Sequence, residues 1–375
     1  MKPSSAIFLV KGGAITPLGD LEDLWRGLLQ GRVAFKPAGR SRPYVAAHCE
    51  FPARDPELSM RRCMALALES TRELGPGSAR SDRCALVFAS TKGEVDQWEL
   101  QRALRVKPLE TGIVLSEMAS ELARRLGIAG RVLATSTACA SGSFAVIEAA
   151  ELLEDGDVEE ALVVGADALS LFIEHGFGSL KAVSLAGARP FDASRDGLTL
   201  GEAGAAVRLS LRAHGGMLGR LVSFGASNDA NHISGPSRDG LGLALAIQRC
   251  LKGQDAGRIR AICAHGTATR YNDAMEAHAF HRVFGRRIPP VFSIKGNIGH
   301  TLGAAGVVEL LVSALVAGRG VIPPTAGFTG QAADEASLDV VHGGPREVGP
   351  GLVLSTNSGF GGMNTALLVG PPEFA

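Results

Sequence analysis

The sequence predicts an α/β protein built from two similar halves. Segments rich in β-forming residues alternate with small-residue turns and longer apolar helices, which is the pattern of βαβ units. The helices predicted at residues 144–153 and 307–317 are apolar on nearly every side, as helices buried between two sheets would be. No proline- or serine-rich linker and no block of like charges divides the chain. We therefore expect an N-terminal half over residues 1–212 and a C-terminal half over residues 213–375, joined near residues 210–218.

A reactive side chain lies inside the clearest βαβ unit. This unit comprises a strand at residues 131–137, a helix at 144–153 and a strand at 161–166. Cys139 stands in the sequence STACASGS, in the turn between the first strand and the helix. A thiol there lies near backbone amides and the positive end of a helix, both of which lower its pKa. Cys139 is therefore a candidate nucleophile, and a buried structural cysteine is the alternative.

Two histidines and a lysine occupy comparable places in the C-terminal half. The second unit comprises a strand at residues 290–294, a glycine-rich turn at 296–306 and a helix at 307–317. His300 lies in that turn, and Lys295 precedes it in the sequence SIKGNIGH. His265 follows a strand predicted at residues 259–264, at the carboxyl end where open α/β sheets gather their sites. A capping or core role is the alternative for His265.

A last glycine-rich stretch, STNSGFGGMN at residues 355–364, could bring a backbone amide close to a bound group or form a simple hairpin. Taken together, the four stretches suit acyl transfer, because a thiolate can form a thioester while imidazoles and backbone amides stabilise charge on carbonyl oxygens. A Cys-His hydrolase is the rival, but it leaves the second histidine and the lysine without a role. Phosphate chemistry is poorly supported because the GxxxxGK[ST] motif is absent.

Composition excludes several other classes of protein. The 375 residues include 38 Lys and Arg and 38 Asp and Glu, so the formal net charge is zero and a non-specific nucleic-acid binder is not expected. Six cysteines without a CxxC pair argue against a disulfide framework and a zinc site. The first apolar run, residues 6–10, is too short for a signal sequence, and no uncharged stretch approaches the roughly 18 to 20 residues of a membrane span. We expect a cytoplasmic protein.

Five ordered motifs resemble those of the elongating β-ketoacyl-acyl-carrier-protein synthases. They are TACASGS around Cys139, PFDASRDGLTLGEAGA at 190–205, HGTATRYNDAMEA at 265–277, SIKGNIGHTLGAAGVVE at 293–309 and NSGFGGMN at 357–364. The resemblance extends from the TPLG turn at residues 16–19 to the C-terminus. It implies a thiolase fold, five-layered αβαβα with two pseudo-symmetric halves, and a homodimer or a heterodimer with a second ketosynthase-like subunit.

The resemblance also implies the chemistry. Cys139 would take an acyl chain from the phosphopantetheine arm of an acyl carrier protein. His265 and His300 would hold the carbonyl of a malonyl thioester, favour the loss of CO2 and stabilise the enolate that attacks the Cys139 thioester. Lys295 and Glu309 would position the loops that carry the histidines. The protein itself would need no metal and no redox cofactor.

Other motif positions would complete the site. The backbone amides of Cys139 and Phe360 would form the oxyanion hole, and Phe360 would be the aromatic gate beside the nucleophile. Thr267 and Thr269 would contact the pantetheine arm. Ser358 and Gly359 precede the gate and would line the substrate pocket.

Three departures from the family pattern favour a specialised role. Cys139 comes early in the chain, the segment at residues 184–189 is short, and Ser358 replaces an aromatic residue usual in fatty-acid enzymes. We therefore expect a synthase for a polyketide, an aryl polyene or an unusual acyl chain. The alternatives are the housekeeping fatty-acid enzyme and a non-catalytic subunit of the chain-length-factor type. In that last group the nucleophile is typically lost, and here it is present.

Overall fold

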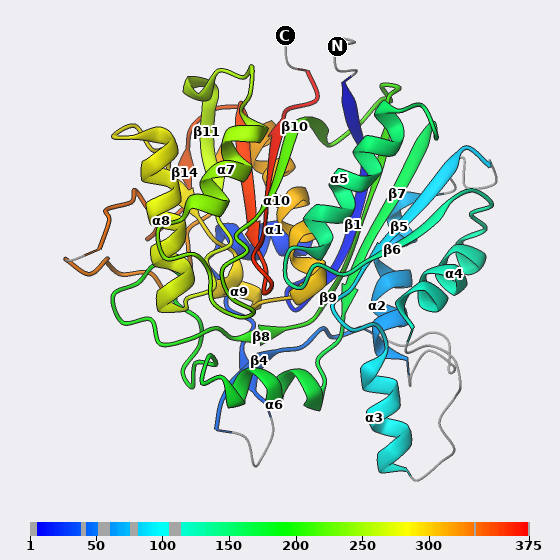
Figure 1. Ribbon diagram of the computed structural model, residues 1–375, viewed down its shortest axis with the longest axis horizontal. Helices are drawn as coiled ribbons and strands as arrows, with labels where there is room; N and C mark the ends of the chain where they lie inside the picture. The colour runs from blue at the N-terminus through cyan, green and yellow to red at the C-terminus, as the bar shows by residue number, and fades with distance from the viewer. Residues whose placement is uncertain are drawn as a thin grey trace.

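Two layers of strands alternate with three layers of helices (Figure 1). The computed structural model describes residues 6–38, 43–51, 61–75, 82–104, 114–333 and 335–373. Helices α2 (Arg62–Thr71) and α4 (Leu115–Leu126) pack on the outer face of the N-terminal strands. Helices α7 (Leu241–Cys250) and α8 (Arg270–Phe284) form the opposite outer layer. With α5 and α10 between the strand layers, this arrangement confirms the predicted five-layered thiolase fold.

The strands of the two halves repeat the same order. The N-terminal half runs β1, β9, β7, β5, β6 and the C-terminal half runs β10, β16, β15, β11, β12. In each half the second strand is antiparallel to both neighbours, and the remaining strands are parallel. Their bounds are β1 Ile7–Thr16, β9 Ala203–Ser210, β7 Glu160–Asp167, β5 Cys84–Ala89, β6 Val132–Thr135, β10 Gly219–Asn228, β16 Met363–Gly370, β15 Leu352–Ser358, β11 Ile259–Cys263 and β12 Val291–Phe292.

The two halves form a single hydrogen-bonded sheet because β1 pairs with β10 in antiparallel register, with Ile7 opposite Leu221. Strand β9 ends at Ser210 and β10 begins at Gly219, so the connection lies where the sequence predicts it. The boundary at residue 212 stays a prediction. Smaller elements complete the chain: β2 Gly19–Asp20, α1 Leu21–Leu29, β3 Lys36–Pro37, β4 Val45–Ala47, α3 Val95–Ala103, α6 Leu171–Ser179, β8 Leu200–Gly201, α9 Lys295–Ile298, β13 Val321–Ile322, β14 Arg346–Glu347 and the short 3-10 turns Arg72–Leu74, Ala256–Arg258 and Leu302–Ala304.

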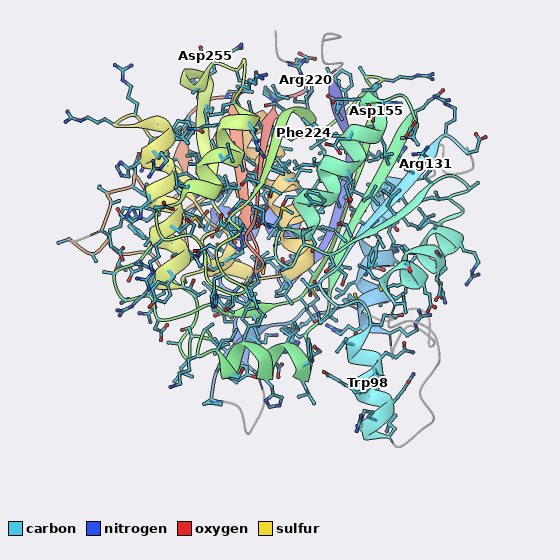
Figure 2. All side chains as sticks on the ribbon, in the orientation of Figure 1. Trp98, Arg131, Asp155, Arg220, Phe224 and Asp255 are labelled. Carbon is cyan, nitrogen blue, oxygen red and sulfur yellow. The ribbon has the colours of Figure 1, made fainter. Side chains whose placement is uncertain are left out.

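Helices α5 (Ser141–Glu154) and α10 (Ala305–Arg319) form the central layer. Every residue of α10 from its start to Ala317 is buried, which confirms the sequence-based expectation. The helices approach so closely that a Cβ on Gly306 would lie 2.2 Å from the backbone nitrogen of Ser143. Figure 2 draws the side chains on the ribbon, and the buried apolar residues of α5 and α10 belong to one hydrophobic cluster with those of the surrounding strands. The central layer therefore sets the distance between the two halves of the molecule.

Leu302–Arg319 is the one stretch within the described ranges that is long and apolar enough to cross a membrane, and 89% of it is buried inside the protein. Because the two strand layers already enclose it, its composition is that of a core helix.

The glycine-rich segment after β12 is more regular than the sequence predicts. The turn expected at residues 296–306 consists of most of α9, a 3-10 turn and the first residues of α10. All residues of α9 are buried. Buried backbone groups require hydrogen-bond partners, and the bond from the Gly299 amide to the Lys295 carbonyl, at 3.1 Å, satisfies that need locally.

Candidate active site

Cys139 lies on a tight turn between β6 and α5. The preceding residue, Ala138, has a φ of 52°, a left-handed conformation that is uncommon for a residue with a side chain. Ser141 fixes the turn: its Oγ accepts from the Thr137 amide at 2.9 Å and donates to the Ala138 carbonyl at 2.5 Å. A strained backbone held by neighbouring hydrogen bonds is typical of functional sites. The turn presents the sulfur at the N-terminal end of α5.

The Cys139 thiol is protonated at rest. Burial raises its pKa to about 12, and the Lys295 ammonium and two backbone amides act in the opposite direction. Those amides belong to Phe360 and to Cys139 itself, and both favour the charged form of the sulfur. They are the amides that the sequence assigns to an oxyanion hole. The sulfur therefore lies where these donors can reach an oxygen on a carbon bonded to it.

His265 follows β11, and its backbone is fixed by a buried carboxylate. The Glu276 side chain accepts from the amides of His265 at 2.8 Å and Gly266 at 2.6 Å. Glu276 comes from α8, and burial raises its pKa to about 8. Ala268, just after the histidine, has a φ of 65°. Glu276 thus has a structural role, since it anchors the loop that carries the imidazole.

Two donors define the tautomer of His265. Its Nδ1 lies 3.2 Å from Lys295 Nζ and 3.2 Å from Asn357 Nδ2. An ammonium group cannot accept a hydrogen bond, and Asn357 Nδ2 also donates to Glu309 Oε2 at 2.6 Å, which fixes the orientation of the amide. Nδ1 is therefore the acceptor, and Nε2 carries the hydrogen. Burial and the Lys295 charge hold the pKa of His265 well below its usual value, so the ring is neutral.

Lys295 and Glu309 form a buried ion pair behind His265. The lysine begins α9, the glutamate lies on α10, and the Lys295 ammonium also donates to the His265 carbonyl at 2.5 Å. Burial is the largest effect on Glu309 and raises its pKa, while Lys295 and Asn357 favour the charged carboxylate. The pair therefore joins three elements around one imidazole, and its role in positioning the histidine loops stays a prediction.

The ring of His300 is free of the contacts that hold His265. Both of its ring nitrogens are buried and lack a hydrogen-bond partner among the residues described. Its backbone is fixed instead, because the His300 amide donates to the Thr199 carbonyl at 2.7 Å and the Gly201 amide donates to the His300 carbonyl at 3.0 Å. Burial and Lys295 lower the pKa of His300 well below its usual value. A neutral imidazole with unused nitrogens is available to a substrate.

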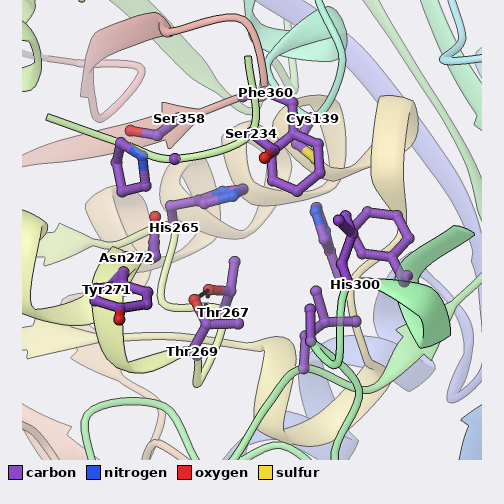
Figure 3. Close-up of a pocket in the computed structure, with 17 residues that line it drawn as sticks. Cys139, Ser234, His265, Thr267, Thr269, Tyr271, Asn272, His300, Ser358 and Phe360 are labelled. Atoms are coloured by element: carbon purple, nitrogen blue, oxygen red, sulfur yellow. Dashed lines mark hydrogen bonds between the residues drawn. The ribbon is translucent and has the colours of Figure 1, made fainter. Parts of the chain in front are cut away.

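The nucleophile and the two imidazoles meet at one point. Their ligand-type atoms, the Cys139 sulfur and one ring nitrogen from each of His265 and His300, lie within 4.8 Å of one another. The two rings are perpendicular at 87°, with centroids 5.2 Å apart. Figure 3 shows both imidazoles pointing into the space beside Cys139. One small group bound there can contact all three side chains at once.

A pocket of about 220 Å³ opens above this point (Figure 3). Thr267 and Thr269 line it, and their hydroxyl groups are hydrogen-bonded to each other at 2.9 Å. Phe177, Leu180 and Leu198 form its apolar side. The pocket thus offers one polar wall and one apolar wall to a bound molecule.

Phe360 forms part of the pocket rim beside Cys139, and its ring packs on Phe177 with centroids 5.6 Å apart. Gly359 is required next to it, because a Cβ there would lie 3.2 Å from the Cys139 amide nitrogen and 2.7 Å from the Thr137 carbonyl oxygen. Ser358 also lines the pocket and donates to Asn364 Oδ1 at 2.7 Å.

The structure brings the predicted site residues together. Eight of them line the pocket: Cys139, His265, His300, Thr267, Thr269, Ser358, Gly359 and Phe360. Lys295 and Glu309 lie directly behind His265. Their roles in catalysis stay predictions. Asn357 was not singled out by sequence reasoning, although its position at the end of a strand, next to the glycine-rich stretch, could have indicated it.

A Cys-His-His site at the centre of a thiolase fold defines a condensing enzyme. Residues 57–214 match the family described as "Beta-ketoacyl synthase, N-terminal domain", and residues 218–329 match "Beta-ketoacyl synthase, C-terminal domain". The chain belongs to the β-ketoacyl synthase family.

Relatives from polyketide and fatty-acid synthesis support this assignment. The ketoacyl synthase alpha subunit of the tetracenomycin polyketide synthase from Streptomyces glaucescens is 36% identical over 296 residues, 74% of this chain and 68% of the relative. The 3-oxoacyl-[acyl-carrier-protein] synthase 2 of Synechocystis is 30% identical over 399 residues, 95% of each. A ketosynthase from Xenorhabdus doucetiae, solved in complex with its chain length factor, has a TM-score of 0.87 and 28% identity over 98% of each chain.

Proposed function

We propose that this protein catalyses the decarboxylative Claisen condensation of an acyl chain held on Cys139 with a malonyl thioester held on an acyl carrier protein. The product is a β-ketoacyl thioester on the carrier, so the enzyme is an acyltransferase. The observation that carries the proposal is the meeting of Cys139, two neutral imidazoles and two backbone amides at the end of one pocket.

The first half-reaction loads the enzyme. The Cys139 sulfur attacks the carbonyl carbon of an acyl pantetheine thioester, and the amides of Cys139 and Phe360 stabilise the oxyanion that forms. Because the thiol pKa is raised to about 12, a base must take its proton as the sulfur attacks. His300 is suited to this step because its ring nitrogens are unoccupied and neutral. The pantetheine thiol leaves with that proton, and an acyl-Cys139 thioester remains.

The second half-reaction forms the carbon-carbon bond. The malonyl thioester loses CO2, and the electron pair of the broken bond passes into an enolate whose oxygen accepts a hydrogen bond from Nε2 of His265. His300 supplies a second donor from the other side of the pocket. The enolate carbon then attacks the acyl-Cys139 carbonyl, and the oxyanion that forms again meets the two amides. As it collapses, the Cys139 sulfur leaves as a thiolate and takes one proton from solvent, which restores the resting thiol. Neutral donors stabilise the enolate without a full counter-charge.

Two features of the site favour condensation over a Cys-His hydrolase and over a zinc site. A Cys-His hydrolase would leave the second imidazole and the buried Lys295-Glu309 pair without a role. Cysteine and histidine are also zinc ligands, but a ring whose Nδ1 accepts hydrogen bonds carries its hydrogen on Nε2, which leaves no lone pair there for a metal. We therefore propose that catalysis requires neither a metal nor a redox cofactor.

Specialised metabolism is the setting that we propose, in the cytoplasm and with an acyl carrier protein as the substrate carrier. The match to a polyketide ketoacyl synthase alpha subunit supports this, and the structural similarity to a ketosynthase solved with its chain length factor supports a dimer with a second ketosynthase-like subunit. The match to the 3-oxoacyl-[acyl-carrier-protein] synthase 2 of Synechocystis supports the fatty-acid enzyme as the second candidate. A chain-length-factor role is disfavoured because Cys139 and both histidines are present and converge.

A condensation assay tests the proposal. The purified protein, alone and with candidate partner subunits, is incubated with an acyl-carrier thioester and malonyl-carrier, and the carrier products are identified by mass spectrometry. We expect a β-ketoacyl carrier whose acyl part gains two carbons, with one CO2 released per product. Release of free acid, or CO2 release without chain extension in every combination, would contradict the proposal.

A further inference from the structure

The direction of the His300 ring depends on its backbone. Both ring nitrogens of His300 lack a hydrogen-bond partner among the described residues, whereas Nδ1 of His265 faces two donors. Hydrogen bonds with Thr199 and Gly201 fix the amide and the carbonyl of His300 itself. A side chain has only a few allowed rotamers, so an imidazole without ring contacts points where its backbone directs it. The chain that follows His300 therefore has to be held as well.

That following chain turns through a residue in an uncommon conformation. Leu302 has a φ of 54°, in the left-handed region that residues with a side chain seldom adopt. Such a conformation persists only where the surrounding structure holds it. Leu302 begins the 3-10 turn Leu302–Ala304, which leads directly into α10. The contacts of this turn thus fix the chain on the C-terminal side of His300.

Asp167 contacts the turn from the N-terminal half of the molecule. It is fully buried at the end of β7, and its Oδ2 accepts from the Gly303 amide at 2.7 Å. No side chain fits at position 303, because a Cβ there would lie 2.7 Å from Asp167 Oδ2 and 2.8 Å from the Cα of Ser90. A hydrogen bond to a charged acceptor is stronger than one between neutral groups. The Asp167 carboxylate is therefore well placed to hold the turn.

Three residues that follow β5 fix the Asp167 carboxylate in turn. Its Oδ1 accepts from the Ser90 hydroxyl at 2.7 Å and from Lys92 Nζ at 2.9 Å. Its Oδ2 accepts from the amide and the hydroxyl of Thr91, at 2.9 and 2.8 Å. Strands β5 and β7 are neighbours in the sheet (Figure 1), and the Lys92 side chain is only 4% exposed. The carboxylate cannot move without breaking several bonds and separating two buried charges.

We propose that Asp167, with its charge balanced by Lys92, is a positioning residue for His300. The inference rests on the proposed function, in which His300 accepts the thiol proton and donates to the enolate. Asp167 is not among the residues that line the pocket, so it would act through the Gly303 amide.

The strand order of the two halves supports this role. Strand β7, which ends at Asp167, is the third strand of the N-terminal half, and β15, which carries Asn357, is the third strand of the C-terminal half. Asn357 contacts the ring of His265 directly. Each half thus holds one imidazole from the end of its third strand, β15 through the ring and β7 through the backbone.

The test separates the hydrogen-bond acceptor of Asp167 from its charge. Two double variants carry Lys92→Met, so that no buried charge loses its partner. Lys92→Met/Asp167→Asn keeps a side-chain oxygen for the Gly303 amide, whereas Lys92→Met/Asp167→Leu removes it. For decarboxylation of malonyl-carrier, followed as CO2 release, loss of the oxygen should lower kcat about 10- to 100-fold and change KM less than twofold, because a misplaced imidazole impairs the chemical step. The variant that keeps the oxygen should stay within about threefold of the wild type.

A second readout shows whether the effect passes through His300. In a His300→Ala background there is no imidazole to misplace, so adding Lys92→Met/Asp167→Leu should lower kcat less than twofold further. A role that is merely structural would lower kcat by the same factor with and without the imidazole. That result would overturn the proposal.

The matched control removes another buried ion pair that follows β5. Glu94 lies two residues after Lys92, is fully buried and pairs with Arg61 at 2.7 Å. Arg61→Met/Glu94→Gln should leave kcat within about twofold of the wild type. An equal loss in this control, or full activity of the variant that lacks the oxygen, would overturn the positioning role and leave the condensation chemistry intact. A wild-type protein that releases no CO2 from malonyl-carrier, even with candidate partner subunits, would contradict the proposed function itself.

Discussion

The Asn357→Leu substitution tests how His265 is held. The Asn357 side chain is buried and donates to Glu309 Oε2 at 2.6 Å and faces His265 Nδ1 at 3.2 Å, whereas its Oδ1 has no partner in the described structure. Leucine has a similar volume and removes only the donors. The loss of a hydrogen bond to a charged group costs about 1.5–3 kcal/mol. If this cost falls on the transition state of decarboxylation, the rate decreases by about 10- to 150-fold.

The two half-reactions separate a positioning role from general damage. Loading of Cys139 uses the sulfur, the backbone amides and His300, none of which Asn357 contacts, so the rate of acyl transfer in Asn357→Leu should stay within about threefold of the wild type. Decarboxylation of malonyl-carrier should fall as calculated. Ser355→Ala is the matched control, because Ser355 is buried on the same strand and its hydroxyl has no partner among the described residues. Equal losses in both half-reactions, or no loss of decarboxylation, would refute the reasoning.

Further predictions concern stability and the thiol. His300 is neutral when folded and has an ordinary pKa of 6.5 when unfolded, so its contribution to stability is present above pH 6.5 and is lost as the pH falls. Between pH 7.5 and 5.5 the free energy of unfolding of the wild type should fall about 1.4 kcal/mol more than that of His300→Asn. Urea titrations at the two pH values measure both changes, and an equal fall in the two proteins would contradict this prediction. Gly306→Ala should destabilise the fold by about 1–3 kcal/mol because its Cβ would meet the Ser143 backbone. Gly318→Ala on the same helix has room for a Cβ and should cost no stability. The denaturant midpoints of the two variants measure the difference, and equal midpoints would contradict the prediction. Alkylation of Cys139 by iodoacetamide should accelerate nearly tenfold per pH unit from pH 7 to 9, and a plateau in that range would show that the pKa is not raised.

The fold and the residues of the site could be predicted largely from the sequence because both rest on local signals. The apolar composition of α10 on every side indicated a central helix, and the strand ends before Cys139 and His265 indicated where reactive groups gather. The family motifs then assigned roles to residues far apart in the chain. The spacing of apolar residues and the composition of turns therefore predict the helices and strands, and the family motifs predict which of them come together in the fold.

What the sequence could not predict depends on contacts between distant residues. The tautomer of His265 follows from two donors, Lys295 and Asn357, that come from different elements. Arg61 is buried against Glu94 and Glu121, and its sequence neighbours do not indicate these ion-pair partners. Helix α9 formed within a glycine-rich stretch because burial demands internal hydrogen bonds. Each of these depends on tertiary packing, which local pattern does not encode.

The most direct test of the central claim is intact-protein mass spectrometry after incubation with a panel of acyl-carrier thioesters. We predict one adduct of acyl mass, absent from Cys139→Ala and retained in Cys63→Ala, which removes another buried cysteine. The preferred acyl group would distinguish a fatty-acid enzyme from a specialised one. An adduct that persists in Cys139→Ala, or no adduct from any donor in the presence of candidate partner subunits, would contradict the assignment of Cys139 as the acyl-carrying nucleophile.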